Sequence, residues 1–296
     1  MHKYRLCLEA EASINGEKTP PNSPTNTLIA DIRSEFVNAS SAIGTIDKLV
    51  LAYYDSGAGT TTEYDDLSAS IATGDWSKTG TPVCEDTDSD NYNDKCTGST
   101  YTVSKTMTAT ADHTINRLRI YSGTKLYFEI SFSDTDIVTD QEVKVEFSIK
   151  ASWQITGYSG FTTDTKVYYE TEEDTSSLRG LLVLLIERLI GKQTSVYWTV
   201  TDAKFQWYDD STSTWKDIEG TVDVNRTEDS ENSIVTAKLY ITPTGTIGEE
   251  VTFGRIVLIA GTDSTNNIDY ESYIYVGPEN PLSEALTNKV TVNISV

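Results

Sequence analysis

Two stretches of the chain repeat the same order of hydrophobic and polar positions. In each stretch, apolar residues at three- and four-residue spacing predict an amphipathic helix, and polar residues of the N-cap type precede it. The first spacing runs from Leu28 to Ile43, and the second runs from Leu178 to Leu189. Gly44 and Gly191 follow them as the predicted helix ends. The predicted N-cap residues are Asn26 and Thr27 for the first helix and Ser176 and Ser177 for the second.

The segments after the two helices also correspond in order. A predicted strand that ends near Asp and Ser comes first, over residues 46–56 and 203–211. The last strand of each stretch, residues 143–149 and 290–296, alternates Val, Ile or Phe with polar residues, as expected when one face is buried and the other is wet. These matches indicate an internal repeat of about 120 residues.

One helix followed by a run of short strands predicts a mainly β fold with two tandem antiparallel β-sandwich units, each preceded by one amphipathic helix. We expect the first unit at residues 26–150 and the second at 177–296, with an ordered connector at 151–176. Residues 1–25 form a predicted N-terminal strand or arm outside both units. Its strand, residues 2–9, alternates apolar and polar side chains, and we expect it to be able to complete the sheet of a neighbouring copy.

This order of elements resembles structural domains from the tail fibres and tail-tip proteins of tailed phages and archaeal viruses. The matching segments are Leu28–Ser56 with Arg117–Ile149, and Leu178–Ser211 with Arg255–Val296. The pattern also suits a subunit of an archaeal extracellular filament or tubule. The resemblance implies a virion or extracellular protein that assembles with copies of itself, or with other virion or appendage proteins. The sequence departs from many fibre proteins because it has no collagen-like or heptad segment.

Charge narrows the set of partners. The chain of 296 residues carries 45 Asp and Glu against 23 Lys and Arg, a formal net charge of −22. Nucleic acids and anionic membranes are bound mainly through Lys and Arg, so we expect neither as a partner. With 2 His and 3 Cys, the chain also has few of the side chains that serve acid–base, nucleophilic or transition-metal chemistry. We therefore expect no enzyme and assign no catalytic residue. His113 follows Asp112 in a predicted turn and does not alter that expectation.

An acidic segment between two cysteines is the one local motif with a chemical mechanism. Its carboxylates occupy positions 1, 3, 5 and 9 of an EF-hand-like loop, and a backbone carbonyl occupies position 7. The loop resembles those of thrombospondin type 3 repeats and dockerins, although Thr97 replaces the bidentate Glu at position 12. The pattern predicts a Ca²⁺ site; the alternative is a solvated acidic surface loop. The predicted ligands are Asp86, Asp88, Asp90, Tyr92 and Asp94.

The cysteines that flank this segment predict a disulfide. A bond between Cys84 and Cys96 would close a loop of about thirteen residues, worth ~3 kcal/mol on the chain-entropy model. Such a bond favours an oxidising, extracellular setting. Cys7 is left over, either as a small residue on the N-terminal strand or as the site of a bond between subunits.

Two functional classes follow from these patterns. The first is a non-enzymatic, self-assembling structural subunit of a virion tail or appendage, or of an extracellular filament or tubule, that assembles through β-strand edges. The alternative is a calcium-dependent carbohydrate-binding or receptor-binding module of a virion or secreted protein. Aromatic residues on predicted strands are candidates for a sugar-binding platform in the alternative, although such residues more often lie in cores or interfaces. These aromatics are Tyr53, Tyr54, Trp207, Tyr208 and Trp215.

Overall fold

Most of the described chain is β-strand. The computed structural model describes residues 2–81, 83–85, 95–158, 166–168, 180–209, 211–244, 252–263, 268–281 and 288–296. Within these residues there are two α-helices, α1 (Asn26–Asn38) and α2 (Leu181–Leu189), and one short 3-10 helix, η1 (Thr73–Asp75). The remaining elements are strands, so the predicted mainly β fold is confirmed.

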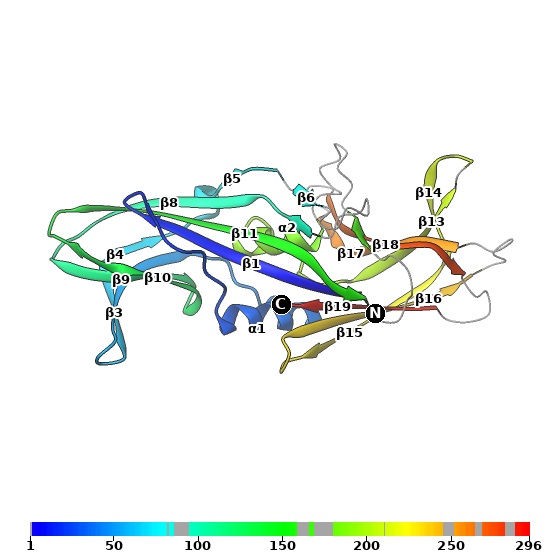
Figure 1. Ribbon diagram of the computed structural model, residues 1–296, viewed down its shortest axis with the longest axis horizontal. Coiled ribbons are helices and arrows are strands. Elements are labelled where there is room, and N and C mark those ends of the chain that lie inside the picture. The colour runs from blue at the N-terminus through cyan, green and yellow to red at the C-terminus, as the bar shows by residue number, and fades with distance from the viewer. Residues whose placement is uncertain are drawn as a thin grey trace.

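The first half of the chain forms two facing antiparallel sheets (Figure 1). One sheet has the order β10-β9-β3-β4, and the facing sheet has the order β1-β11-β8-β5. Phe128 on β10 and Phe147 on β11 pack with ring centroids 5.8 Å apart, so the sheets share a core. The strands are β1 (His2–Ile14), β3 (Lys48–Asp55), β4 (Thr60–Ser70), β5 (Ser77–Thr79), β8 (Thr100–Thr108), β9 (His113–Ser122), β10 (Lys125–Ile137) and β11 (Glu142–Tyr158).

The second half repeats this arrangement. One sheet has the order β18-β17-β13-β14, with β12 beyond β18, and the facing strands have the order β15-β16-β19-β1. The strands are β12 (Lys166–Tyr168), β13 (Asp202–Asp209), β14 (Thr214–Asp217), β15 (Gly220–Asp229), β16 (Ile234–Pro243), β17 (Thr252–Asp263), β18 (Ile268–Pro281) and β19 (Asn288–Ser295). Because β1 pairs with both β11 and β19, the facing strands of the two halves form one ten-stranded sheet in the described residues, here called the long sheet. Three short strands complete it: β2 (Glu17–Lys18), β6 (Val83–Glu85) and β7 (Lys95–Thr97).

The strand orders of the two halves match position by position. The order β10-β9-β3-β4 corresponds to β18-β17-β13-β14, and β11-β8 corresponds to β19-β16. The two predicted sandwich units, each preceded by one helix, are therefore confirmed. Strand β11 continues to Tyr158 and so crosses the predicted unit boundary at residue 150. The exact domain boundaries stay a prediction.

The first helix is shorter than its apolar spacing predicted. It ends at Asn38, where Ala39 adopts a left-handed conformation (φ 48°) and donates its N–H to the Glu35 carbonyl. The prediction that the helix runs on to Gly44 is wrong, because the Glu35 carboxylate accepts the backbone N–H groups of Ala42 and Ile43 and holds them outside the helix. Its N-cap residue is Thr25, so the predicted caps Asn26 and Thr27 lie inside the first turn.

The second helix ends as predicted, with Gly191 at φ 74° just beyond it. Its predicted caps, Ser176 and Ser177, lie outside the described residues.

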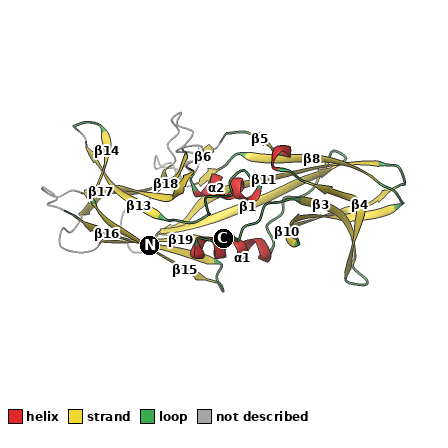
Figure 2. Cartoon of the chain, turned by 180° about the vertical axis from the view of Figure 1, so that it is seen from behind, coloured by secondary structure: helices red, strands yellow, loops and turns green. Residues whose placement is uncertain are grey.

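Both helices lie at the middle of the long axis, where the two halves meet (Figure 2). Helix α1 contacts β10 of the first half and β15 and β16 of the second, and α2 contacts β11 and β18. The buried side chains form one hydrophobic cluster that continues through both halves. Phe36 and Trp198, with ring centroids 5.4 Å apart, join the halves within this cluster.

A buried ion pair links the two helices. Arg188 on α2 donates to Glu35 on α1 from Nε at 2.8 Å and from a terminal nitrogen at 3.0 Å, and the two side chains are 4% and 0% exposed. Glu35 also accepts the Trp198 backbone N–H at 2.8 Å, and Arg188 donates to the carbonyls of Ile43 and Gln193. The polar groups at this junction therefore have protein partners, as buried charges require.

Candidate functional site

The first strand completes both halves of the molecule. All thirteen residues of β1 pair with β11 in antiparallel fashion, and residues His2–Arg5 also pair with β19 in parallel. The other strand pairings in the described chain are antiparallel. Figure 1 shows β1, in blue, running between β11 and β19. Strand β1 has no counterpart in the repeated order, so it is shared by the two halves.

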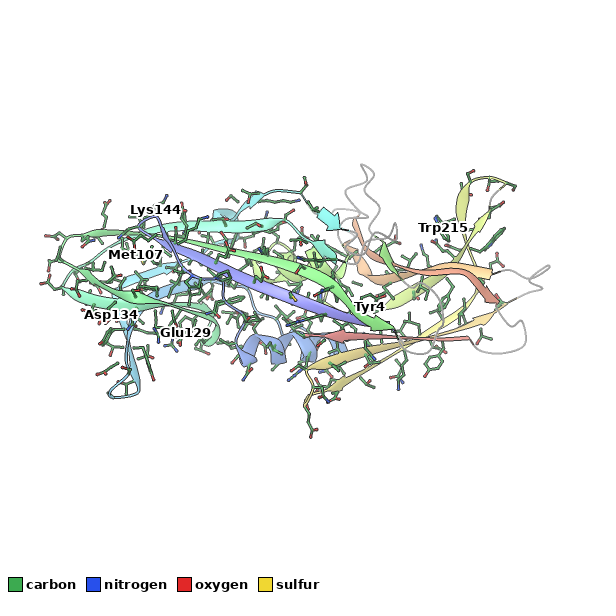
Figure 3. All side chains as sticks on the ribbon, viewed as in Figure 1. Tyr4, Met107, Glu129, Asp134, Lys144 and Trp215 are labelled. Carbon is green, nitrogen blue, oxygen red and sulfur yellow. The ribbon has the colours of Figure 1, made fainter. Side chains whose placement is uncertain are left out.

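The inner face of β1 belongs to the core. Its alternate side chains are at most 6% exposed. Tyr4, labelled in Figure 3, packs edge-on against Trp153 of β11 with ring centroids 6.2 Å apart. The buried side chains are Tyr4, Leu6, Leu8, Ala10, Ala12 and Ile14. The chain's own strands β11 and β19 thus hold, within a single sheet, the strand that the sequence placed outside both repeats.

The outer face of β1 makes an ion pair and a hydrogen bond to β11. Lys150 lies 2.9 Å from a carboxylate oxygen of Glu9, and the hydrogen bond between them raises the pKa of Lys150. Ser13 donates to a Glu146 carboxylate oxygen at 3.4 Å. These contacts pair specific positions on the two strands, so they favour one register.

Residues 15–25, here called the return segment, fold back along the edge of β1. Asn15 and Gly16 make the turn with φ values of 51° and 89°, a region that Asn and Gly tolerate. Asn22 then exchanges two backbone hydrogen bonds with Ala10, and Thr19 donates its N–H to the Ala12 carbonyl. The segment also contains Pro20, Pro21 and Pro24, which have no N–H to donate. Together with the pairing of β2 (Glu17–Lys18) with Ser13 and Ile14, these bonds attach the return segment to residues 10–14 of β1, and none of them reaches residues 2–9.

Part of the edge of β1 is open. Between Arg5, the last partner of β19, and Ala10, the partner of Asn22, the described residues provide no ladder partner on this side. A hollow of about 620 Å³ lies along this gap. Apart from β1 itself, its lining includes Ile29 and Ile32 of α1 and the terminal Val296.

Strand β15 lies at one end of the long sheet. Its ten residues pair with β16, and within the described chain its other edge has no strand partner. Asp223, Glu228 and Asp229 are exposed on it. Charged side chains on an edge strand discourage pairing with another edge, and salt weakens that repulsion.

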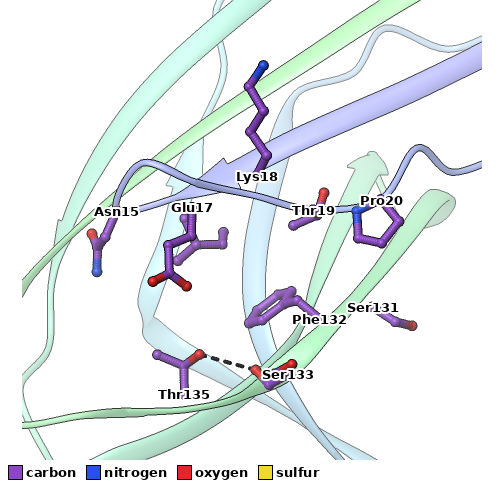
Figure 4. A pocket seen from close by; sticks show the side chains of 10 residues that line it. Asn15, Glu17, Lys18, Thr19, Pro20, Ser131, Phe132, Ser133 and Thr135 are labelled. Carbon is purple, nitrogen blue, oxygen red and sulfur yellow. Dashed lines mark hydrogen bonds between the residues drawn. The ribbon is translucent and has the colours of Figure 1, made fainter.

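A second hollow lies at the far end of the first half, between the turn after β1 and strand β10 (Figure 4). Its volume is about 540 Å³, and Phe132 forms part of its wall. The charged residues of its lining are Glu17 and Lys18. The hollow is open, its lining mixes polar and apolar side chains, and no cluster of reactive groups lies among its lining residues.

His113 takes part in a structural cluster on the first half. Its Nε2 atom lies 2.9 Å from Asp66, and its ring stacks on Tyr64 with centroids 4.0 Å apart. Burial raises the pKa of the Asp66 carboxyl, but hydrogen bonds from the Thr110 N–H and from His113 outweigh it and lower the pKa to about 2. The carboxylate therefore joins β4 to the start of β9.

The predicted calcium ligands lie outside the described residues. These are Asp86, Asp88, Asp90, Tyr92 and Asp94, and the Ca²⁺ site stays a prediction. In the part of the chain that the structure describes, no group of three or more His, Cys, Asp or Glu residues could hold a metal ion.

The strands on either side of the acidic segment are described. Their register places Cys84 directly opposite Cys96 in the β6–β7 hairpin. Opposed residues of an antiparallel pair have Cα atoms about 4.5–5.5 Å apart, within the range that a disulfide spans. This register supports the predicted disulfide, which remains to be tested.

We expect Ca²⁺ to raise the melting temperature and EDTA to lower it, because several carboxylates held close together repel one another until a cation neutralises them. Differential scanning calorimetry in either condition measures the effect. The matched control is the double variant Asp88→Asn/Asp90→Asn, whose melting temperature should no longer respond to Ca²⁺. Wild-type melts that coincide in Ca²⁺ and EDTA would rule out the site.

The candidate aromatic platform is divided between the two ends of the molecule. Tyr53 and Tyr54 lie on β3 of the first half, whereas Trp207 and Trp215 lie on the β13–β14 hairpin of the second half, where Figure 3 labels Trp215. The ammonium group of Lys216 lies 5.5 Å from the centre of the Trp207 ring. The Tyr208 side chain is outside the described residues. The five aromatics therefore do not form a single surface.

Comparisons with known proteins assign no family: no protein-family model, curated protein or solved structure matches this chain. Among the described residues, no helix is both long and apolar enough to cross a membrane. Two features of the described residues connect the halves: β1, which lies in the slot between β11 and β19, and the Glu35–Arg188 junction. The sequence predicted a strand at residues 2–9 but not its place between β11 and β19, and it did not predict the Glu35–Arg188 pair.

Proposed function

We propose that the protein is a non-enzymatic structural subunit that assembles with copies of itself through β-strand edges, in a virion tail or appendage or in an extracellular filament or tubule. The observation that carries this proposal is the way the fold is completed. A terminal strand that belongs to neither repeated half inserts between β11 and β19 and closes both halves. A protein built in this way recognises strands through backbone pairing and alternating side-chain contacts.

The charged clusters of the described chain support a structural role. Glu35 and Arg188 are each bonded to several protein groups, and Asp66 is bonded to His113 and Thr110. Groups engaged in this way stabilise packing between elements. A continuous core through both halves likewise suits a building block that must keep its shape inside an assembly.

The test is to measure the mass and shape of the purified protein. Light scattering and negative-stain electron microscopy over rising concentration, at low and high salt and with Ca²⁺ or EDTA, should show regular high-mass assemblies. Salt should promote assembly, because it screens a net charge of −22 on each copy. A protein that stays monomeric in every condition would contradict the proposal. Glycan-array binding by such a monomer would favour the carbohydrate-binding alternative.

A further inference from the structure

We propose that β1 is exchanged between copies, so that β1 of one molecule occupies the slot between β11 and β19 of the next. This inference rests on the proposed function and names the strand that performs the assembly. The occupant of the slot is the identical strand of a second copy. Repetition of this exchange from copy to copy gives an open chain of subunits.

The slot already fits this occupant. In the described chain β1 contributes thirteen pairs with β11, a parallel contact with β19 and six buried side chains. A second copy carries the same strand, so an exchanged β1 makes the same backbone pairs and buries the same side chains. The closed and exchanged forms therefore differ mainly in the return segment and in the entropy of association.

The return segment is suited to act as the hinge. Only the closed form requires the tight turn at Asn15 and Gly16, the pairing of β2 with the end of β1, and the backbone bonds of Thr19 and Asn22 to β1. At the other end of the segment, Thr25 donates its N–H to the Tyr127 carbonyl and anchors the start of α1 to its own first half. Eleven residues fully extended reach about 36–40 Å, and three prolines favour an extended form.

Exchange of β1 affects both halves of the fold, because the strand pairs with both. Strand β1 runs along the first half, and its N-terminal end lies beyond the middle of the long axis, on the side of the second half, where it pairs with β19 (Figure 1). A donated β1 therefore contributes to both halves of the acceptor at once. Direct pairing of β15 edges is less favourable, because each copy presents Asp223, Glu228 and Asp229 there.

A single substitution distinguishes an exchanged strand from a retained one. Cys7 of β1 lies directly opposite Ser152 of β11. Opposed residues in an antiparallel pair have Cα atoms about 4.5–5.5 Å apart, within the range that a disulfide spans. In Ser152→Cys, oxidation or a short bifunctional thiol reagent should therefore link Cys7 to the introduced cysteine. We expect oxidised assemblies to run as a covalent ladder on denaturing, non-reducing gels, with peptide mass spectrometry identifying the β1–β11 link.

A second measurement uses the same variant before assembly. When the link is formed in dilute monomers, it ties β1 to its own β11, and we expect that protein not to assemble until it is reduced. The matched control is Ser148→Cys, which lies on the same face of β11 but opposite Glu11, and should give no link to Cys7.

The outcomes separate this inference from the function on which it rests. Assemblies of Ser152→Cys in which every link from Cys7 to the introduced cysteine lies within a single chain would overturn the exchange of β1 and leave self-assembly intact. Assembly by the linked monomer without reduction would overturn it as well. Wild-type protein that never assembles would overturn the proposed function itself.

Discussion

Replacing Arg188 with Met is expected to destabilise the protein by about 3–5 kcal/mol, because it leaves the Glu35 carboxylate buried without its counterion. Glu35 is fully buried, and Arg188 supplies both of its side-chain donors from α2. For a chain of this size the expected fall in melting temperature is roughly 10 °C. Thermal unfolding followed by near-ultraviolet circular dichroism measures it.

The double variant Glu35→Gln/Arg188→Met provides the matched comparison. The double variant removes the unpaired buried charge but keeps a side-chain oxygen that can accept backbone N–H groups. We therefore expect it to recover at least half of the stability that Arg188→Met loses. Lys125→Met is the control for an exposed ion pair. Lys125 lies 2.8 Å from Asp31 of α1 but is 47% exposed, and we expect a loss under about 1 kcal/mol. Equal losses of unfolding free energy in Arg188→Met and Lys125→Met would show that the buried pair contributes no more to stability than the exposed one.

The junction explains why the repeated halves form one unit. Glu35 comes from the helix of the first half and Arg188 from the helix of the second, and Trp198 contacts both. Their shared hydrogen bonds fix the relative position of α1 and α2. We expect the wild-type halves to unfold together in one transition, since breaking this junction exposes a core that both share.

The fold was largely predictable from periodicity. Alternation at period two predicted the last strand of each stretch, and the structure places these residues in β11 and β19 at equivalent positions. The alternation of residues 2–9 likewise predicted a strand, which the structure extends to Ile14. Such patterns show which face of a strand is buried, so they predict a strand without knowledge of its partner.

Two features of the structure could not be predicted from local sequence patterns. The apolar spacing of the first helix continued to Ile43, but the chain leaves the helix at Asn38 because the Glu35 side chain bonds to backbone groups of the following turn. The pairing of Glu35 with Arg188 joins residues that are 153 positions apart. The only sequence signal for it was the presence of charged residues inside apolar helical stretches, which does not identify their partners.

Strand β1 also has a parallel contact with β19 that its own sequence could not reveal. Alternating side chains show that a strand has one buried face, but they do not specify the neighbour on either edge. The structure supplies that neighbour and changes how the role of β1 must be tested. Loss of assembly after deletion of β1 would not distinguish an exchanged strand from one needed only for folding, because the strand lies in the core of both halves.

Deleting residues 2–14 is therefore expected to abolish cooperative unfolding altogether. Burial of Leu6, Leu8 and Ile14 alone contributes about 5–9 kcal/mol, comparable to the whole stability of a typical protein. We expect the truncated chain to lose its near-ultraviolet circular dichroism signal and to bind a hydrophobic dye. A truncated chain that melts like the wild type would contradict the central place of β1 in the core.

Adding a synthetic peptide of residues 2–14 to the truncated chain should restore the signal and a melting transition that rises with peptide concentration, because the slot between β11 and β19 then binds a strand from a separate chain. The control peptide carries Leu6→Asp and Leu8→Asp, which would place two charges in the core, and it should not restore folding. Rescue by both peptides, or by neither, would mean that the slot does not select β1 through its buried face. Rescue by the native peptide alone would show that β1 needs no covalent link to the chain that it completes, which is the physical requirement for passing it from one copy to the next.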